Sequence, residues 1–301
     1  MPEKIICRKF LLSYCLMLFI TMNSSAQPGN QFTQTAGALQ SLANKIQHGE
    51  NDSVRNSANK VFQQQLKDLL LASSAINLDS VKNISVLTAP DNSFRIFTWT
   101  LPHYGGSYSY FGYLQIINQK TRASTVIDLV DSTDEIEKPE AARLKAGRWF
   151  GSVYYKIIMA KKDKKTYYTL LGWKGKNQLS TQKVIDVLYF SGDQPLFGFP
   201  LFKTENVYRN RLIFEFPSQA VMSLRYEESK KLIVFDHLST ASKKKDENIN
   251  SIAGPDGTYD ALKFKGGKWI LLKDIDIRTD WNPKKQPGEP QIHEAPVEII
   301  K

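Results

Sequence analysis

The segment Gly147–Gly172 reads GRWFGSVYYKIIMAKKDKKTYYTLLG and contains the longest strand pair that the sequence predicts. Trp149–Ala160 and Thr166–Trp173 are rich in aromatic and β-branched residues, which favour strands. The charged run Lys161–Lys165 between them is typical of a turn. We therefore expect a β-hairpin here.

The first arm of this hairpin carries large apolar groups at odd and at even positions. Because side chains alternate along a strand, Tyr154 and Ile158 are expected on one face and Tyr155 and Ile157 on the other. A strand that is apolar on both faces must be covered on both. The hairpin is therefore expected in the middle of a sheet that lies between two layers.

Strand patterns recur along most of the chain and are separated by short turns containing glycine, proline or asparagine. About a dozen such strands predict a mainly β protein, an antiparallel meander arranged as a sandwich, a barrel or a propeller-like fold. Outside the hairpin, the main expected strands are Ile84–Leu87, Phe94–Leu101, Tyr108–Ile117, Thr125–Val130, Lys183–Phe190, Arg211–Phe216, Val221–Tyr226, Leu232–Asp236, Thr258–Phe264 and Trp269–Ile277.

Two helical patterns precede the strands, within residues 34–75. The first runs from about Gln34 to His48 and is followed by Gly49, a residue that commonly ends helices. The second begins after Asp52 or Ser53, either of which can cap it. Both have a narrow apolar stripe, so we expect a helical hairpin that lies on the sheet.

The first 26 residues have the features of a signal peptide. Positive residues precede the apolar run Phe10–Ile20, and Ser24 and Ala26 are the small residues expected before a cleavage point. The run is shorter than the roughly 20 residues that span a bilayer, so no transmembrane segment is expected after removal of residues 1–26. Export to the periplasm or outer membrane would follow. Removal would also take away Cys7 and Cys15, which leaves neither a disulfide nor a thiol nucleophile.

The rest of the chain divides by composition into three parts. Residues 27–33 are polar and are expected to be a mobile N-terminus. Residues 34–279 hold all the expected helices and strands and are expected to form a single β-rich domain. Residues 280–301 contain four prolines and are expected to form an extended tail.

The chain is basic, with a formal net charge of +10. Its lysines fall in turn-like runs such as Lys161–Lys165 and Lys243–Lys245, where they keep strands soluble and edges unpaired. Dispersed charge of this kind, together with the expected export, argues against nucleic acid as a partner.

The segment Pro102–Tyr113 has the most unusual composition, PHYGGSYSYFGY. Tyrosines are flat, amphipathic and lose little entropy when ordered, so such a loop can stack on sugar rings or grip a peptide. The alternative is a glycine turn that opens a strand whose tyrosines pack in the core. The candidate ligand-binding residues are His103, Tyr104, Tyr108, Tyr110 and Tyr113.

An enzyme is the competing class. Asp274 and Asp276 would point to the same side of a strand and could form the carboxylate pair of a glycoside hydrolase. His103 and His237 could join a triad assembled across the fold. However, the sequence contains no recognised catalytic or nucleotide-binding motif, and nothing predicts a metal site or a cofactor.

Four segments carry a resemblance to other proteins: Ser24–Gln27, Leu87–Trp99, Lys183–Phe190 and Tyr259–Trp269. Together they resemble uncharacterised exported proteins of Gram-negative bacteria, a group with no assigned activity. The resemblance implies export and a β-rich fold and supplies no functional residue. We expect an exported, non-enzymatic protein that binds a glycan, a peptide or another envelope component, with an envelope or polysaccharide hydrolase as the alternative.

Overall fold

The computed structural model describes residues 28–73, 76–118, 120–121, 123–204, 207–240 and 252–276, with side chains from residue 35 onward. The expected signal peptide, residues 1–26, and the proline-rich tail, residues 280–301, lie outside the described residues.

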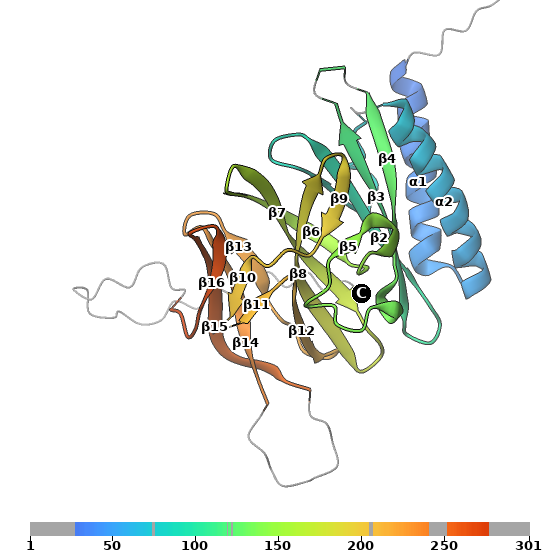
Figure 1. Ribbon diagram of the computed structural model, residues 1–301. Coiled ribbons are helices and arrows are strands. Elements are labelled where there is room, and N and C mark those ends of the chain that lie inside the picture. Colours follow the sequence, from blue (N-terminus) through green and yellow to red (C-terminus); the bar gives the residue numbers. More distant parts are fainter. Residues whose placement is uncertain are drawn as a thin grey trace, which may run out of the picture.

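Two long helices open the described chain and form the expected hairpin (Figure 1). They are α1 (Pro28–His48) and α2 (Asp52–Ala72). The side chain of Asn51 caps α2 by accepting a hydrogen bond from the Val54 amide, at 3.0 Å. Residues 28–33 were expected to precede the first helix, and they form its first turns instead. Proline suits that position because a first-turn residue needs no amide donor.

Sixteen strands follow in the described part of the chain, arranged in three sheets. The helix-side sheet has the order β1 (Ser85–Thr88), β2 (Phe94–Pro102), β3 (Tyr108–Ile117), β4 (Ser124–Val130). The middle sheet has the order β5 (Leu144–Lys145), β9 (Gln194–Phe197), β8 (Ser180–Ser191), β7 (Lys165–Gly175), β6 (Val153–Lys162), and β12 (Leu212–Pro217) also pairs with β8.

The third, outer sheet contains the rest of the strands. Its order is β11 (Val207–Arg209), β10 (Phe202–Thr204), β16 (Lys268–Leu272), β15 (Gly254–Lys265), β14 (Leu232–Ser239), β13 (Leu224–Glu227). All strand pairs in the three sheets are antiparallel except β10 with β16. The predicted mainly β, antiparallel fold with an N-terminal helical hairpin is confirmed.

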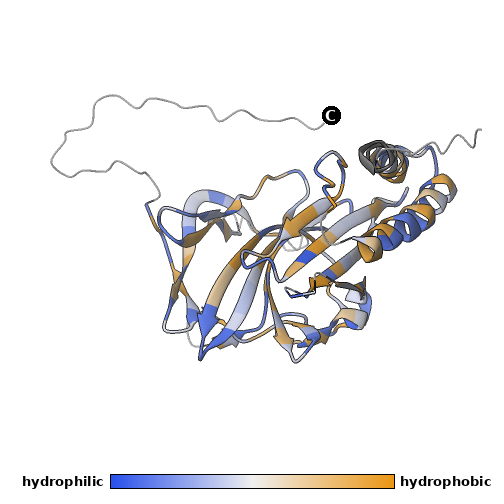
Figure 2. Ribbon diagram, turned by 90° about the horizontal axis from the view of Figure 1, so that it is seen from above, coloured by the Kyte–Doolittle hydropathy of each residue, from blue (hydrophilic) through white to orange (hydrophobic). Residues whose placement is uncertain are grey.

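The elements stack in four layers, and three hydrophobic cores lie between them (Figures 1 and 2). Along β2, Phe97 and Trp99 pack under the helices, whereas Phe94 and Ile96 face the middle sheet. The same alternation in β7 and β8 divides the middle sheet between its two neighbours. Each sheet has two edge strands, so the described strands do not form a closed barrel. Of the three expected arrangements, the layered sandwich is the one observed.

The β6–β7 hairpin is present and is covered on both faces, as predicted. Its two-residue turn consists of Asp163 and Lys164, both with positive φ (49° and 63°), the pattern of the tightest hairpin turns. Two details of the prediction were wrong. First, β6 is the last strand of the middle sheet and not an interior one. Second, the pairing shifts between Tyr154 and Lys156, so Tyr154 and Ile157 enter the same core.

A chain of buried polar side chains crosses the core between the helix-side and middle sheets. The Trp149 indole donates to the Tyr154 hydroxyl at 3.0 Å, and that hydroxyl donates to Asp186 at 3.2 Å. The Arg211 Nε lies 2.8 Å from the same carboxylate oxygen, and both residues of this ion pair are fully buried. Burial, together with the charge of Asp186, raises the pKa of Tyr154 well above its usual value. The network therefore holds β8 against the segment that precedes β12.

Candidate functional site: a pocket where three loops meet

Two of the five candidate tyrosine-segment residues lie in the cores. The Tyr110 hydroxyl donates to the Gly175 carbonyl at 2.8 Å, between the helix-side and middle sheets. The Tyr113 hydroxyl lies under the helices and donates to the Gln63 carbonyl at 3.1 Å. Burial raises the pKa of both phenols. These two tyrosines face opposite sides of the sheet, because they lie an odd number of positions apart.

The other three candidates lie near the β2–β3 turn. His103 contacts Ser109 at 2.7 Å, and its Nδ1 lies 3.9 Å from a carboxylate oxygen of Asp52 at the start of α2. Tyr104 is 90% exposed at the tip of the turn. Tyr108 is half-buried and lines a pocket. The five residues therefore do not share one cleft, and only Tyr108 belongs to the hollow described next.

This hollow has a volume of about 580 Å³ and lies where the β2–β3, β7–β8 and β12–β13 connections meet. Gln178 joins the three loops. Its side-chain amide donates to the Gly105 carbonyl at 3.3 Å, and its backbone carbonyl accepts from the Ser218 hydroxyl at 2.6 Å. The pocket is thus preorganised by hydrogen bonds between loops. Its lining residues are Gly106, Tyr108, Trp173, Asn177, Gln178, Thr181, Lys183, Phe216, Ser218, Ala220, Val221 and Met222.

Two aromatic rings form one wall of the pocket. Tyr108 and Trp173 meet edge to face, with ring centroids 5.4 Å apart. Gly175 makes this contact possible, because a Cβ there would lie 2.5 Å from the Tyr108 ring and 2.8 Å from the Trp173 ring. Both rings are half-buried and are therefore available to a ligand.

Lys183 is the single charged residue of the lining. It lies directly opposite Trp173 in the β7–β8 pair, and its ammonium lies 5.1 Å from the centre of the Tyr155 ring. In the part of the chain that the structure describes, no carboxylate lies within ion-pair distance of it. Burial lowers the pKa of this ammonium. An anionic group on a ligand would compensate for the lost hydration.

The strand that was expected to carry Asp274 and Asp276 ends before it reaches them. Strand β16 ends at Leu272, so Asp274 and Asp276 lie beyond it, where strand alternation does not apply. Asp274 is exposed and has a positive φ of 51°, and neither residue lines the pocket. Within the described ranges, no group of three or more acids, histidines or cysteines is placed to hold a metal ion.

The sequence allowed a Ser-His-Asp arrangement built on His103 or His237, and His103 has partners of this kind. Its Nε2 lies 2.7 Å from the Ser109 hydroxyl, but its Nδ1 lies 3.9 Å from Asp52, which is beyond hydrogen-bond distance. The His237 Nδ1 lies 2.9 Å from Asp260 on the neighbouring strand, an interaction that raises the pKa of the imidazole. His103 lies beside helix α2, in a different layer. Neither histidine lines the pocket.

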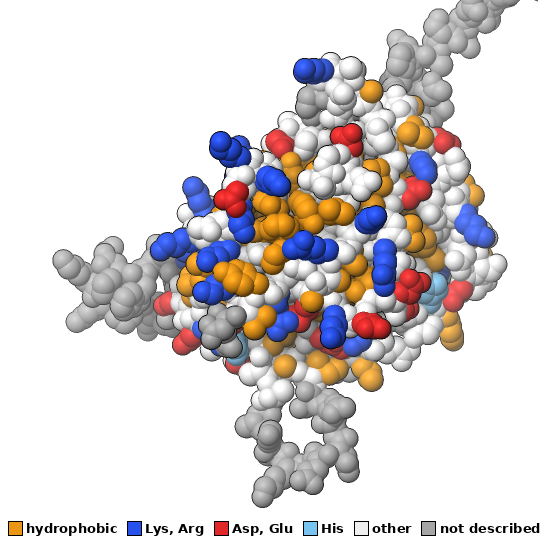
Figure 3. All heavy atoms as spheres, in the orientation of Figure 1, with side chains coloured by type: hydrophobic (Ala, Val, Ile, Leu, Met, Phe, Trp, Pro, Cys, Tyr) orange, Lys and Arg blue, Asp and Glu red, His pale blue; other side chains and the backbone are white. Residues whose placement is uncertain are grey.

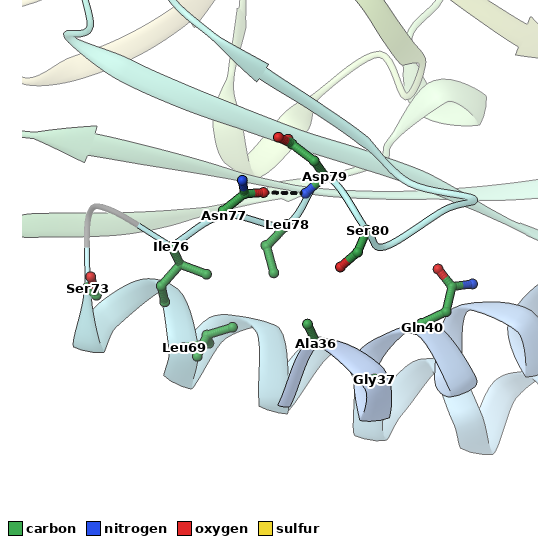
Figure 4. A pocket seen from close by; sticks show the side chains of 10 residues that line it. All are labelled: Ala36, Gly37, Gln40, Leu69, Ser73, Ile76, Asn77, Leu78, Asp79 and Ser80. Atoms are coloured by element: carbon green, nitrogen blue, oxygen red, sulfur yellow. Dashed lines mark hydrogen bonds between the residues drawn. The ribbon is translucent and has the colours of Figure 1, made fainter. Parts of the chain in front are cut away.

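A second hollow, of about 880 Å³, lies between the two helices and the segment 76–80 (Figure 4). Leu69, Ile76 and Leu78 point into it. The side-chain oxygens of Gln40 and Asn77 already accept hydrogen bonds from the backbone amides of Lys82 and Asp79. Few polar groups therefore remain to orient a ligand here.

Sequence reasoning missed most of the pocket, including Trp173, Gln178 and Lys183. The turn GKNQLS, residues 175–180, was a usable signal. Its polar residues are as typical of a recognition loop as those of the tyrosine segment are. Nothing local indicated that this turn meets the β2–β3 turn, because 73 residues separate Gln178 from Gly105.

The fold and the pocket define a layered, mainly β protein with a preorganised, acid-free pocket at the end of its sheets. No known family model, curated protein or solved structure matches the chain. Neither described helix combines the length and apolar character that crossing a membrane requires.

Proposed function

We propose that this is an exported, non-enzymatic binding protein of the cell envelope whose pocket takes a glycan bearing a negative group. One observation carries the proposal: an aromatic wall, Tyr108 and Trp173, stands beside the cation Lys183, which pairs with no carboxylate among the described residues, in a lining without acids. Aromatic rings pack on sugar faces, and the ammonium can bind a carboxylate or phosphate. A volume of about 580 Å³ is within the range of small-ligand sites.

The pocket does not favour the alternative, a polysaccharide hydrolase. Glycoside hydrolysis uses two carboxyl groups on either side of the scissile bond. The lining has none, and Glu215, next to the lining residue Phe216, is held by Lys176, Ser180 and Gln182. Release of reducing ends from envelope polysaccharides by the purified chain would revive this alternative.

The test uses two sugars that differ by one acidic group, N-acetylmuramic acid and N-acetylglucosamine. We expect calorimetry to show tighter binding of the acid. Replacing Lys183 with methionine is expected to weaken binding of the acid by about tenfold or more and to leave the neutral sugar unaffected, because a hydrogen bond to a charged group is worth about 1.5–3 kcal/mol.

Lys60→Met is the matched control, because Lys60 is an exposed lysine on α2, away from the pocket. It should bind both sugars as the unmodified chain does. Equal loss of affinity in the two variants, or no binding of either sugar, would contradict the proposed pocket. Cell fractionation with N-terminal sequencing tests export, and a chain found only in the cytoplasm with an intact Met1 would contradict it.

A further inference from the structure

A second surface, at the opposite ends of β7 and β8 from the pocket residues Trp173 and Lys183, combines aromatic rings with cations. Tyr167, Tyr189 and Phe199 cluster at one end of the middle sheet, with the Phe199 centroid 4.6 Å from Tyr167 and 5.1 Å from Tyr189. Tyr189 and Phe199 are half-buried. Arg143 and Lys162 place their charged groups 5.5 and 5.6 Å from the centre of the Phe199 ring. The cluster is therefore flanked by two cations.

The outer sheet also places an aromatic ring beside lysines. Tyr208 is 51% exposed on β11 and lies directly opposite Lys203 of β10. Lys268 donates to its hydroxyl at 3.3 Å, and this hydrogen bond with the charges of Lys268, Lys203 and Lys162 lowers the Tyr208 pKa. Lys162 connects the cluster on the middle sheet with the outer sheet, because its side chain packs against Gly267. A Cβ on residue 267 would lie 2.7 Å from the Lys162 side chain. Cationic and aromatic groups thus extend across two sheets.

These eight residues, Arg143, Lys162, Tyr167, Tyr189, Phe199, Lys203, Tyr208 and Lys268, define the cationic aromatic face. Figure 3 shows hydrophobic side chains exposed near the centre of the view, with lysines and arginines around them. Among the described residues, none of the four cations lies within 4.0 Å of a carboxylate. The pKa of Tyr167 is raised by burial and by the charge of one nearby acid, Asp163 in the β6–β7 turn. The face therefore keeps an excess of positive charge.

We propose that the cationic aromatic face binds an acidic polysaccharide, a linear chain of sugar rings that carry carboxylates or similar anionic groups. Such a chain offers flat faces to the aromatic rings and repeated negative charges to the four cations. The proposal goes beyond the pocket and rests on the proposed function only in one respect, that export brings the protein to such polymers.

The shape of the face favours a polysaccharide over a lipid bilayer. Proteins that dock on bilayers bury an apolar surface in the headgroup and acyl boundary. Here Tyr167 is buried, Tyr189 and Phe199 are half-buried, and each ring is flanked or covered by its neighbours. The face presents rings and charges, with Val207 and Tyr208 as its exposed apolar side chains on β11.

The experiment measures binding of the whole purified chain to alginate, a linear polyuronate, by biolayer interferometry. Neutral dextran, polyphosphate, an oligothymidylate and phosphatidylglycerol vesicles are compared under the same conditions. We expect binding to alginate that weakens as salt rises from about 0.05 to 0.5 M, and no binding to dextran. Polyphosphate, which has charges without rings, is expected to bind more weakly than alginate. Equal or tighter binding of polyphosphate, oligothymidylate or vesicles would overturn the assignment to a polysaccharide.

Variants with lysines replaced test which surface of the protein binds alginate. Replacing Lys162, Lys203 and Lys268 with alanine is expected to lower alginate affinity by about tenfold or more. The same replacement of three exposed lysines away from this face, Lys45, Lys60 and Lys120, is the charge-matched control and should have a much smaller effect. An equal loss in both triple variants would mean that net charge alone binds the polymer, which contradicts the proposal.

Two single variants test the contribution of the rings, and a competition experiment separates this face from the pocket. Tyr208→Ala is expected to reduce alginate affinity about three- to tenfold through the lost ring contact, whereas Tyr104→Ala, which removes a more exposed tyrosine elsewhere, should not. Free N-acetylmuramic acid, the probe used for the pocket, should not displace alginate. Displacement would place the polymer in the pocket and overturn the face as its site. Failure of the pocket proposal alone would leave the alginate result intact.

Discussion

Lys174 is the most completely buried lysine among the described residues, with 4% of its surface exposed. Its ammonium donates to the Gly151 carbonyl at 2.6 Å and to the Thr133 hydroxyl at 2.9 Å, and it lies 4.0 Å from the centre of the Tyr110 ring. Burial lowers its pKa to about 8, although the charges of Asp131 and Asp134 oppose this shift. The hydrogen bonds and the ring contact make the charge tolerable without a direct ion pair.

This lowered pKa gives a stability prediction with an unusual sign. Between about pH 8 and the ordinary lysine pKa of about 10.4, the unfolded chain holds a proton on Lys174 that the folded chain releases. The contribution of Lys174 to the free energy of unfolding therefore increases as pH rises through this window. Urea unfolding at about pH 7.5, 8.5 and 9.5 measures it, below the range where tyrosines with raised pKa values act in the opposite direction.

Lys174→Met is the comparison, since methionine is of similar length and does not titrate. We expect the free energy of unfolding of the unmodified chain to increase relative to that of the variant as pH rises. A difference that is constant across the three pH values would contradict the assigned pKa. Lys60→Met, at an exposed site, should show such a constant difference.

At the scale of elements, the β6–β7 hairpin depends on a turn that its second residue, Lys164, does not favour. Lys164 has a φ of 63°, which an L-residue other than glycine, asparagine or aspartate rarely adopts. Glycine adopts it without steric cost but loses more entropy on folding. We expect Lys164→Gly to raise the free energy of unfolding by a few tenths of a kcal/mol to about 1 kcal/mol.

The matched change is Lys161→Gly, two positions before the turn in the paired part of β6. There glycine has no conformational advantage and should destabilise the protein by about 0.5–1 kcal/mol. Thermal unfolding of the two variants against the unmodified chain gives both values. Destabilisation by Lys164→Gly of the same size as by Lys161→Gly would show that the turn residues are not strained.

At the scale of the whole molecule, the middle sheet contributes to two cores at once. Leu170 and Val184 face the helix-side sheet, whereas Leu171 and Ile185 face the outer sheet. Removing the outer sheet would expose one whole apolar face of the middle sheet to water. We therefore expect the three sheets to unfold together.

Native-state hydrogen exchange measures this cooperativity. The slowest amides of β2, β8 and β14, one strand from each sheet, are expected to exchange with the same free energy of opening, equal to that of global unfolding. A lower value confined to β14 would mean that the outer sheet opens as a separate unit, and would contradict the single β-rich domain expected for residues 34–279.

Local patterns in the sequence determined both helices, most of the longer strands and the two-sided burial of the β6–β7 hairpin, but not the short strands β5, β9, β10 and β11. Helical spacing predicted both helices, and alternation of large apolar residues predicted covered strands, because these periodicities are set by the geometry of each element alone. The bulge at Tyr154–Lys156 escaped this reasoning. An extra residue in a strand leaves no mark on local composition and reverses the faces of every residue after it.

The tertiary structure decided the site. Alternation along β3 predicts that Tyr110 and Tyr113 face opposite sides, but it does not say that both sides are covered by other layers, which makes these tyrosines packing residues. The pocket around Lys183 and the cationic aromatic face each combine residues from strands or loops that are distant in sequence. A single residue's chemistry is local, whereas a site needs several side chains at fixed separations, and only the packing of the layers sets those separations.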